Sequence, residues 1–532
     1  MRLLILFAFI NIIAPAEILF SQAYGPVEDR YSTLRQNSAS TLEAAGMQIW
    51  VGPGLNRIDE LSGEIFAPQD ADSIFDGRGR IYSLDVSNQT ILGGVGYTST
   101  RGGSESPTAM GYYLSDNAGV SWDFFSFPLD DRPPDECEAD SVGPPCDIEF
   151  NYGGQTYIRT RITVPEQSPP YEVDLQGNVI LSVNWASGLL RSIDRGNTWE
   201  RLILPPSSES ELNPANVYEW NSQGNGESIN RYDPRFDTNL LGFGLLIDDN
   251  ETVWVGTAGG INRSENALSA PFEEIEWDRI AFDPESENGL LANWIIKIRQ
   301  QPGTNRIWMT NWRTDPENRD QFGLVYTDDG GETFRQFLTG EKVNDFGFFE
   351  DRVYAAADDG LFYSSDDGAS WERINQITSP NAYLPPDISY LAVTASDNRL
   401  WVGTSDGIAS TENGSDWQIV RVNVPLRGGN IYQPDAPSVN TYAYPNPFSP
   451  QMHNEVRIKF ETETEGEASL QIYDFSMTRV RSMKEAGISE PGSYEFIWDG
   501  RDRHGRFVSN GTYFYTIKTS DGEATGKILL LN

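Results

Sequence analysis

The chain has 532 residues and a formal net charge of −39, from 78 acidic and 39 basic side chains. Hydrophobic residues make up 38% of it and aromatic residues 12%, which is enough to build a core and argues against wholesale disorder. Nucleic acid is excluded as a good partner, because binding phosphates needs a basic surface and this chain repels them.

Histidine and cysteine are scarce. Both histidines, His453 and His504, lie in the last eighty residues, so the rest of the chain cannot form a Ser-His-Asp triad, a Cys–His pair or a His-ligated zinc site. The two cysteines also exclude a four-thiolate zinc site. Chemistry in the larger part of the chain has to use carboxylates, Tyr, Lys, Arg or oxygen-ligated metals.

The N-terminus has the pattern of a secretory signal peptide. Arg2 precedes an apolar run at 3–13, and small-x-small cleavage sites follow at 14–16 and 21–23. We expect a signal peptide over 1–23. The alternative, a membrane anchor, needs about 20 uninterrupted apolar residues, and Glu17 interrupts the run. No later segment has the length and apolarity of a transmembrane helix.

The two cysteines, Cys137 and Cys146, lie close together in an acidic, Pro-rich stretch. In an oxidising compartment such a pair is expected to form a disulfide. Closing a short loop in this way contributes about 2–3 kcal/mol on the chain-entropy model. We expect a local loop staple; a redox site is the alternative.

One short motif of the form S-x-D-x-G-x-T-W recurs along the chain. Looser copies begin at Ser115 and Ser410, and a degenerate copy begins at Ser264. The motif suits a hairpin turn in which the carboxylate accepts backbone N–H groups, glycine takes a positive φ and the aromatic packs beneath the loop. The side chains that define the three clean copies are Ser192, Asp194, Gly196 and Trp199; Thr327, Asp329, Gly331 and Phe334; and Ser364, Asp366, Gly368 and Trp371.

Each copy follows two alternating apolar runs that are separated by small residues, as at 252–264 and 399–410. With an N-terminal piece at 48–59, about seven such units follow one another within 24–424, and helical periodicity is almost absent. Repeated strand–strand–turn–strand units predict an all-β fold, a β-propeller of about seven blades.

The recurring motifs resemble the Asp-box (BNR) repeats of sialidase-like and sortilin-like propellers. The W-V-G-T-x-x-G segments are similar to two-component-regulator-type propeller repeats, and the resemblance covers about 45–425. It implies that each Asp box is a structural turn between the third and fourth strands of a blade, distant from the ligand face.

The sequence pattern changes after a polar, turn-rich stretch at 425–440, which we expect to be a linker. Alternating runs with Gly-rich turns then predict a small Ig-like β-sandwich over 441–532. Its motifs, in order, are Y-P-N-P-F at 444–448, I-Y-D at 472–474, W-D-G-x-D-x-x-G at 498–505, G-x-Y-x-Y at 511–515 and K-x-L-L at 527–530.

These ordered motifs closely resemble the C-terminal sorting domain of type IX secretion cargo, which is similar to the hook-capping Ig-like fold. Ser476-Met477 departs from the family, which usually has Gly after I-Y-D-x. The resemblance implies the type IX secretion machinery as a partner and passage across the outer membrane of a Gram-negative cell, followed by release or surface attachment. An adhesive Ig module that stays attached is the alternative.

Four long insertions mark the face where we expect binding. Those at 97–110 and 311–322 interrupt second-to-third turns, and those at 127–156 and 205–240 link blades. Because the boxes occupy third-to-fourth turns, we expect all four insertions on the opposite face, where long loops are commonly functional. Decoration without a ligand is the alternative.

Two kinds of residue on that face are candidates for binding. Trp185 and Trp312 occupy equivalent second-to-third turns, where an indole suits stacking on a sugar or peptide; a buried core position is the alternative for both. Oxygen ligands in the acidic insertion could hold Ca²⁺, although the spacing of an EF-hand is missing and a solvated acidic loop is the alternative. These calcium candidates are Asp135, Glu136, Glu138 and Asp140.

The sequence therefore predicts an exported propeller that binds a glycan or protein ligand on its insertion-rich face, with no assigned catalytic residue. The alternative is an extracellular glycoside hydrolase or polysaccharide lyase of the two-carboxylate or Tyr/Arg type. Residues 160–165 do not match the F/Y-R-I-P segment of sialidases. We expect two facing carboxylates in a deep central cleft for an enzyme, and shallow aromatic side chains for a binder.

Overall fold

In the computed structural model, the regular structure of the described part is almost entirely β-strand, with no α-helix and two short 3-10 helices, η1 (Thr238–Leu240) and η2 (Phe272–Glu274). No helix in that part is long and apolar enough to cross a membrane. The predicted signal peptide lies outside it, and the expected domain boundaries stay predictions. The described residues are 29–31, 34–67, 79–101, 103–138, 141–224, 227–313, 321–374, 376–379, 382–384, 388–422, 426, 439–450, 455–488 and 491–531.

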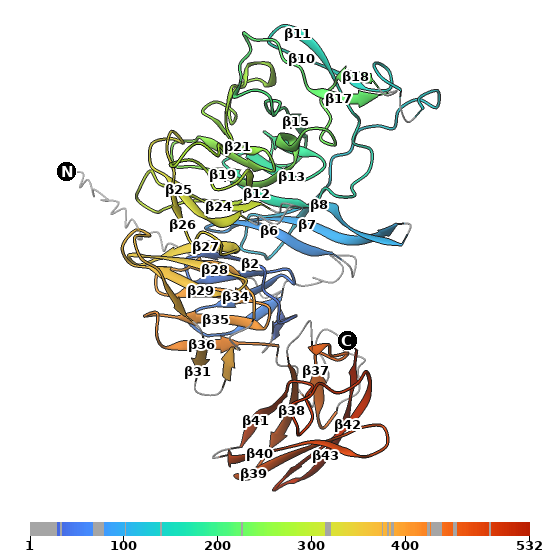
Figure 1. The fold of residues 1–532 in the computed structure, drawn as a ribbon, viewed down its shortest axis with the longest axis vertical. Helices are drawn as coiled ribbons and strands as arrows, with labels where there is room; N and C mark the ends of the chain where they lie inside the picture. The colour runs from blue at the N-terminus through green and yellow to red at the C-terminus, as the bar shows by residue number, and fades with distance from the viewer. Residues whose placement is uncertain are drawn as a thin grey trace, which may run out of the picture.

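Seven antiparallel blades form a β-propeller (Figure 1). Blades 1 and 4 each carry a fifth strand on the outer edge, β1 (Asp29–Tyr31) and β16 (Glu211–Leu212). From the innermost strand outward, the blades are β2 (Thr41–Ala45), β3 (Gln48–Gly52), β4 (Asn56–Asp59) and β5 (Ile65–Ala67); β6 (Arg80–Ser87), β7 (Thr90–Arg101), β8 (Ser104–Ser115) and β9 (Asp123–Ser126); β12 (Pro170–Gln176), β13 (Val179–Asn184), β14 (Gly188–Ser192) and β15 (Glu200–Leu202); β19 (Gly242–Ile247), β20 (Val253–Thr257), β21 (Gly260–Ser264) and β22 (Trp277–Ile280); β23 (Trp294–Gln300), β24 (Ile307–Arg313), β25 (Gln321–Thr327) and β26 (Arg335–Phe337); β27 (Val343–Phe349), β28 (Arg352–Ala357), β29 (Gly360–Ser364) and β30 (Glu372–Ile374); and β33 (Tyr390–Ala395), β34 (Leu400–Thr404), β35 (Gly407–Thr411) and β36 (Trp417–Val420).

The innermost strands form a closed ring, in which each contacts the next and β33 of blade 7 contacts β2 of blade 1. Blade 7 and the segment before β2 are joined by backbone hydrogen bonds, from Ala39 N–H to Thr404 O (3.0 Å) and from Gly407 N–H to Asn37 O (2.8 Å). The second strands β3, β20 and β34 are buried throughout, because sheets pack against them on both sides.

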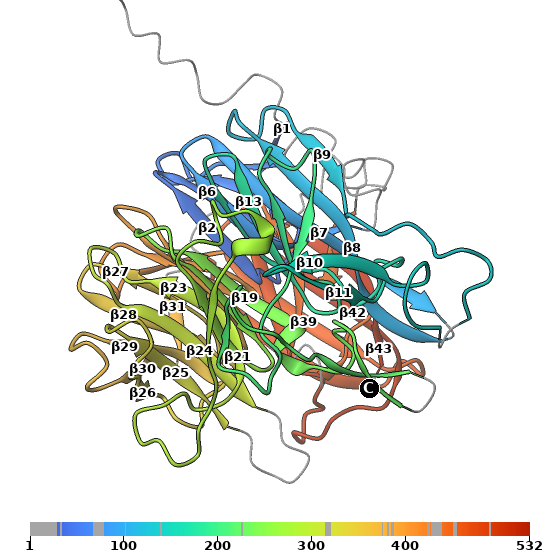
Figure 2. The ribbon, with the colours of Figure 1, turned by 90° about the horizontal axis from the view of Figure 1, so that it is seen from above.

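The two blade-linking insertions build an added layer on blades 3 and 4. Their hairpins, β10 (Ile148–Tyr152) with β11 (Gln155–Arg159) and β17 (Asn221–Gly224) with β18 (Glu227–Asn230), lie at the end of the molecule opposite the C-terminal domain (Figure 1). Figure 2, seen from that end, shows β10 and β11 in front of the C-terminal strands. Aromatic side chains fill the core beneath, among them Tyr152, Tyr157, Trp220, Tyr232 and Trp277.

One expectation about the insertions is wrong. The insertion that contains β10 and β11 does not project only from the face opposite the Asp boxes. At its tip the Tyr152 hydroxyl donates to the carbonyl of Ile275 (2.8 Å), in the third-to-fourth turn of blade 4. The hairpin extends along the outer edge of the propeller to this turn because its aromatic side chains are buried against that edge.

The C-terminal residues form a two-sheet sandwich. One sheet holds β37 (Tyr442–Tyr444), β38 (Val456–Thr462) and β41 (Gly492–Trp498), and the other has the order β40 (Arg479–Ile488), β39 (Gly466–Tyr473), β42 (Gly511–Thr519) and β43 (Gly522–Leu530). The two faces share a separate core, which includes Phe448, Ile458, Phe460, Leu470, Ile472, Trp498, Tyr515 and Ile528. The predicted fold class, a propeller of about seven blades followed by a small Ig-like sandwich, is confirmed.

Candidate binding site at the channel mouth

The two faces of the propeller follow from strand order. Consecutive turns of an antiparallel blade alternate between the two ends of its strands. The third-to-fourth turns with the Asp boxes therefore lie on one face, here called the box face. The second-to-third turns and the starts of the innermost strands lie on the other, here called the mouth face.

Each clean Asp box is a closed hydrogen-bonded turn. Asp194 accepts the Thr198 N–H (2.8 Å) and the Thr198 hydroxyl (2.7 Å), while the Ser192 hydroxyl donates to Asp194 (2.9 Å) and accepts the Gly196 N–H (2.8 Å). Gly196 has a φ of 92°, and a Cβ there would lie 2.9 Å from the Phe125 ring in the outermost strand of the preceding blade. Glycine thus serves both the turn and the close packing of neighbouring blades.

The other boxes repeat this arrangement. Asp329 and Asp366 accept the corresponding N–H and hydroxyl groups of Thr333 and Ser370, at 2.6–2.9 Å. In the copy that begins at Ser115, Asn117 takes the place of the aspartate. The copy expected from Ser410 is out of register by one residue, because its hydroxyl and amide are those of Thr411 and Asn413. All these hydrogen bonds lie within the turns.

Three innermost strands begin with a β-bulge whose extra residue is aromatic. The register of β6, β12 and β19 shifts around Tyr82, Tyr171 and Phe243, respectively. A bulge leaves one residue unpaired and re-aims its side chain. Three successive blades therefore present an aromatic ring at the mouth of the central channel.

The rings form a continuous series, here called the aromatic arc, made of Tyr82, Tyr171, Phe243, Trp294 and Trp185. Neighbouring ring centroids along it lie 4.8–6.0 Å apart. All five side chains are half-buried. The structure thus places Trp185, one of the two predicted aromatic candidates, in a larger aromatic surface. Sequence reasoning missed the other four, because neither the bulged aromatics nor the regularly paired Trp294 differ in local sequence from any other strand residue.

The arc borders a cavity of about 550 Å³ at the mouth of the channel. The lining includes Gln36 and Ser38 from the segment before β2, and it includes two cations, Arg80 and Lys297. Among the described residues no carboxylate lines this cavity, although the chain has twice as many acidic as basic residues. The mouth is therefore suited to a neutral or anionic ligand with a flat apolar face.

Trp312 has different surroundings. Its indole N–H donates to the carbonyl of Val343 (2.7 Å), and the Lys342 ammonium lies 4.7 Å from its ring centroid. Both partners belong to the start of blade 6, whereas Trp312 belongs to blade 5. The structure therefore does not bring the two predicted tryptophans together, and Trp312 joins adjacent blades.

Below the mouth, the channel holds a cluster of charged side chains from the innermost strands, beside a cavity of about 360 Å³. Arg299 pairs with Glu43 (2.9 Å) and Asp345 (3.3 Å), and Lys297 pairs with Glu172. Burial raises the pKa of Glu43 and of Glu172 above the usual value. Charged residues at alternate positions of otherwise apolar strands were the signal that could have revealed this cluster.

Three aspartates of the channel join neighbouring blades. Asp85 accepts the Leu175 N–H (2.7 Å), Asp174 accepts the Ile247 N–H (2.6 Å) and Asp345 accepts the Val393 N–H (3.0 Å). In each case the acceptor lies on one innermost strand and the donor on the next. Each carboxylate of the cluster thus accepts a backbone N–H of the next blade or pairs with Lys297 or Arg299.

The acidic insertion contains the predicted disulfide between Cys137 and Cys146, which is confirmed. Its calcium candidates Asp135, Glu136 and Glu138 are exposed. They are part of no group of three His, Cys, Asp or Glu side chains that could hold a metal within the described residues. The fourth candidate, Asp140, lies outside those residues.

Comparison with known proteins identifies one family. Residues 449–523 match the FlgD Ig-like domain family. No curated protein matches the chain. The match covers the sandwich alone, so it assigns a family to that domain and leaves the propeller without one.

Several solved structures are similar in fold. PorZ, a surface component of the type IX secretion system of Porphyromonas gingivalis, has 12% identity over 93% of this chain and 75% of its own, with a TM-score of 0.32. The Niastella koreensis GH74 enzyme has 12% identity over 95% and 75%, with a TM-score of 0.45. YCF48 from Cyanidioschyzon merolae has 14% identity over 74% and 98%, with a TM-score of 0.41. At these scores the likeness does not decide function.

Proposed function

We propose that the chain is an exported β-propeller that binds a glycan or protein ligand at the mouth of its central channel, and that its Ig-like domain delivers it through type IX secretion. The observation that carries the binding proposal is the aromatic arc. Three of its half-buried rings, Tyr82, Tyr171 and Phe243, come from successive blades and line one cavity, and Trp185 and Trp294 extend the aromatic surface beside them.

The chemistry of the mouth favours recognition by stacking. Flat sugar rings and planar peptide groups both pack well on indole and phenol faces. Arg80 lies over the Tyr82 ring at 4.6 Å and donates to its hydroxyl, so a cation borders the aromatic surface. A ligand that combines an apolar face with a neutral or acidic polar edge suits this surface best.

The geometry favours binding over two-carboxylate hydrolysis. The accessible mouth is lined by aromatic and small polar side chains, whereas the carboxylates lie deeper and already accept backbone N–H groups or pair with Lys297 and Arg299. A hydrolase needs one acidic and one basic carboxyl group free to face the scissile bond.

The delivery proposal depends on the C-terminal sequence motifs. The motifs that resemble a sorting domain lie in a sandwich with its own core, and 449–523 match an Ig-like domain family. In this proposal, the predicted signal peptide at 1–23 directs export across the inner membrane. Fractionation of cells that carry the full chain, with and without an intact sorting domain, tests this step separately from binding.

A glycan array and a peptide panel, probed with the mature full chain, test the binding proposal. We expect Phe243→Ala to weaken binding by about 2 kcal/mol, roughly 30-fold, because Phe243 is the central ring of the arc. Phe475→Ala is the matched control, since Phe475 is an exposed aromatic of the C-terminal domain. Equal binding by the wild type and the Phe243 variant would contradict the assignment of the site.

A further inference from the structure

One residue of the segment before β2, Asn37, makes several of the contacts that close the ring of blades. Asn37 accepts the Gly407 N–H at its carbonyl (2.8 Å) and the Val422 N–H at its side-chain oxygen (2.7 Å), and its amide donates to Asp406 (3.3 Å). These three partners belong to blade 7 or to the residues that directly follow it. Asn37 therefore holds the N-terminal segment against blade 7.

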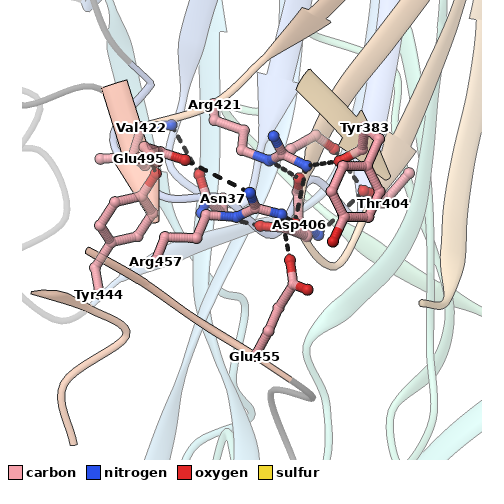
Figure 3. A network of polar contacts seen from close by, with 11 residues as sticks. Asn37, Tyr383, Thr404, Asp406, Arg421, Val422, Tyr444, Glu455, Arg457 and Glu495 are labelled. Atoms are coloured by element: carbon pink, nitrogen blue, oxygen red, sulfur yellow. Dashed lines mark hydrogen bonds and ion pairs between the residues drawn. The ribbon is translucent and has the colours of Figure 1, made fainter. Parts of the chain in front are cut away.

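Asp406 also forms an ion pair with an arginine of the Ig-like domain (Figure 3). Asp406 lies in the second-to-third turn of blade 7, on the mouth face. It pairs with Arg421 of the propeller (3.1 Å) and with Arg457 of β38 in the C-terminal sandwich (2.6 Å). The Arg457 side chain is only 3% exposed. The Asp406 carboxylate thus contacts Asn37 at the start of the ring, Arg421 at its end and Arg457 of the C-terminal domain.

Each side of this contact keeps a counter-charge of its own. Arg457 also pairs with Glu455 and Glu495, both in the C-terminal domain, and Asp406 also pairs with Arg421. Breaking a buried ion pair is costly mainly when it leaves one charge without a partner. Here neither domain would be left with an unpaired charge, so the two domains can separate at this point.

The segment that Asn37 anchors is also a wall of the cavity at the mouth. Gln36, Ser38 and Ser40 line that cavity, on either side of Asn37 and before β2. Residue 39 between them is tied to blade 7 by its backbone N–H. Only a few residues of one segment therefore separate the contact at Asp406 from the mouth.

We propose that the Ig-like domain is a releasable clasp on the ring closure of the propeller. When it is docked, Arg457 orients Asp406 so that Asn37 and the segment 34–40 stay fixed against blade 7. When it is released, both domains remain folded, but this segment opens more often and the wall of the mouth becomes more mobile. The clasp goes beyond the proposed function, and only its effect on the ligand depends on that function.

Hydrogen exchange on the full chain tests the clasp without a ligand. We expect Arg457→Gln to raise amide exchange in 34–45 and 400–411 by about ten-fold or more, because local opening controls exchange there. Exchange in 242–257 of blade 4 should stay unchanged. Arg506→Gln is the control, since Arg506 forms an exposed ion pair with Asp502 inside the same Ig-like domain.

A second variant covers the case in which Arg457→Gln unfolds the sandwich. Asp406→Asn removes the same ion pair from the propeller side and leaves Arg457 paired with its two other partners, Glu455 and Glu495. We expect the same rise in exchange at 34–45, with a larger radius of gyration by small-angle scattering. Unchanged exchange in 34–45 for Asp406→Asn, or an equal rise in the Arg506 control, would overturn the clasp.

Discussion

The carboxylate of Asp85 on blade 2 accepts the backbone N–H of Leu175 on blade 3 at 2.7 Å, and so joins two neighbouring blades across the central channel. Asp174, one residue before Leu175, makes the equivalent contact with Ile247 on blade 4. Both carboxyl groups are half-buried and lie near other acids. Burial, with the nearby charges of Glu43 and Glu172, raises the pKa of Asp85 to about 7, and burial beside Asp85 raises that of Asp174.

This shift predicts a pH dependence of stability. A carboxyl with a higher pKa in the folded chain stabilises the fold fully below its unfolded pKa of about 4 and loses that contribution as the pH rises towards about 7. We therefore expect Asp85→Asn to raise the melting temperature at pH 8 and to have a clearly smaller effect at pH 5. The asparagine carbonyl still accepts the Leu175 N–H, and calorimetry at both pH values measures the difference.

The matched control for this experiment is Asp345→Asn. Asp345 lies in the same channel and also accepts a backbone N–H, but it pairs with the half-buried Arg299. Removing the negative charge of Asp345 leaves the positive charge of Arg299 with one fewer counter-charge. This variant should therefore lower the melting temperature at both pH values. If Asp85→Asn is as destabilising at pH 8 as Asp345→Asn, the pKa of Asp85 is not raised in the folded chain.

The Asp boxes should contribute to the stability of the propeller and not to ligand binding. Asp194→Ala, Asp329→Ala and Asp366→Ala each remove the acceptor of two hydrogen bonds that close a turn. We expect each to lower the melting temperature by a few degrees and to leave ligand affinity unchanged, because the turns lie on the box face. Paired calorimetry and binding measurements decide this, and a loss of affinity at constant melting temperature would contradict it.

The two predicted tryptophans should behave differently. Trp185 belongs to the aromatic arc, so Trp185→Ala should weaken binding at the mouth by about 2 kcal/mol and change unfolding little. Trp312 instead donates to Val343 and stacks with Lys342 of the next blade, so Trp312→Ala should mainly lower the melting temperature. Thermal unfolding and binding of both variants, measured side by side, test the distinction. The opposite assignment of the two effects would place the ligand near blade 6.

Local chemistry explains what the sequence could predict. A box such as Ser192–Trp199 satisfies its hydrogen bonds within eight residues, so each repeat was visible without knowledge of the fold. The repeated turns then implied a ring of blades. The disulfide between Cys137 and Cys146 was predictable for the same reason, because both residues lie in one short loop.

The remaining features depend on long-range placement. A bulge adds one residue to a strand, and nothing in the local sequence distinguishes Tyr82 or Phe243 from a normally paired aromatic. The contact between Asp406 and Arg457 joins two domains, and it depends on how one docks against the other. The outer position of the β10–β11 hairpin likewise depends on where its aromatic side chains find a surface to bury against.

Deleting 439–532 should separate delivery from folding. The sandwich has its own core, so its loss should leave the propeller folded but stranded in the periplasm, because the sorting motifs are gone. Loss of the contact at Asp406 should also lower the melting temperature of the propeller slightly. The full-length Arg457→Gln variant is the matched control, because it breaks this contact and keeps the sorting motifs, so it should still reach the surface or medium. Fractionation with immunodetection measures both proteins, and delivery of the truncated chain at the normal level would show that the sorting assignment is wrong.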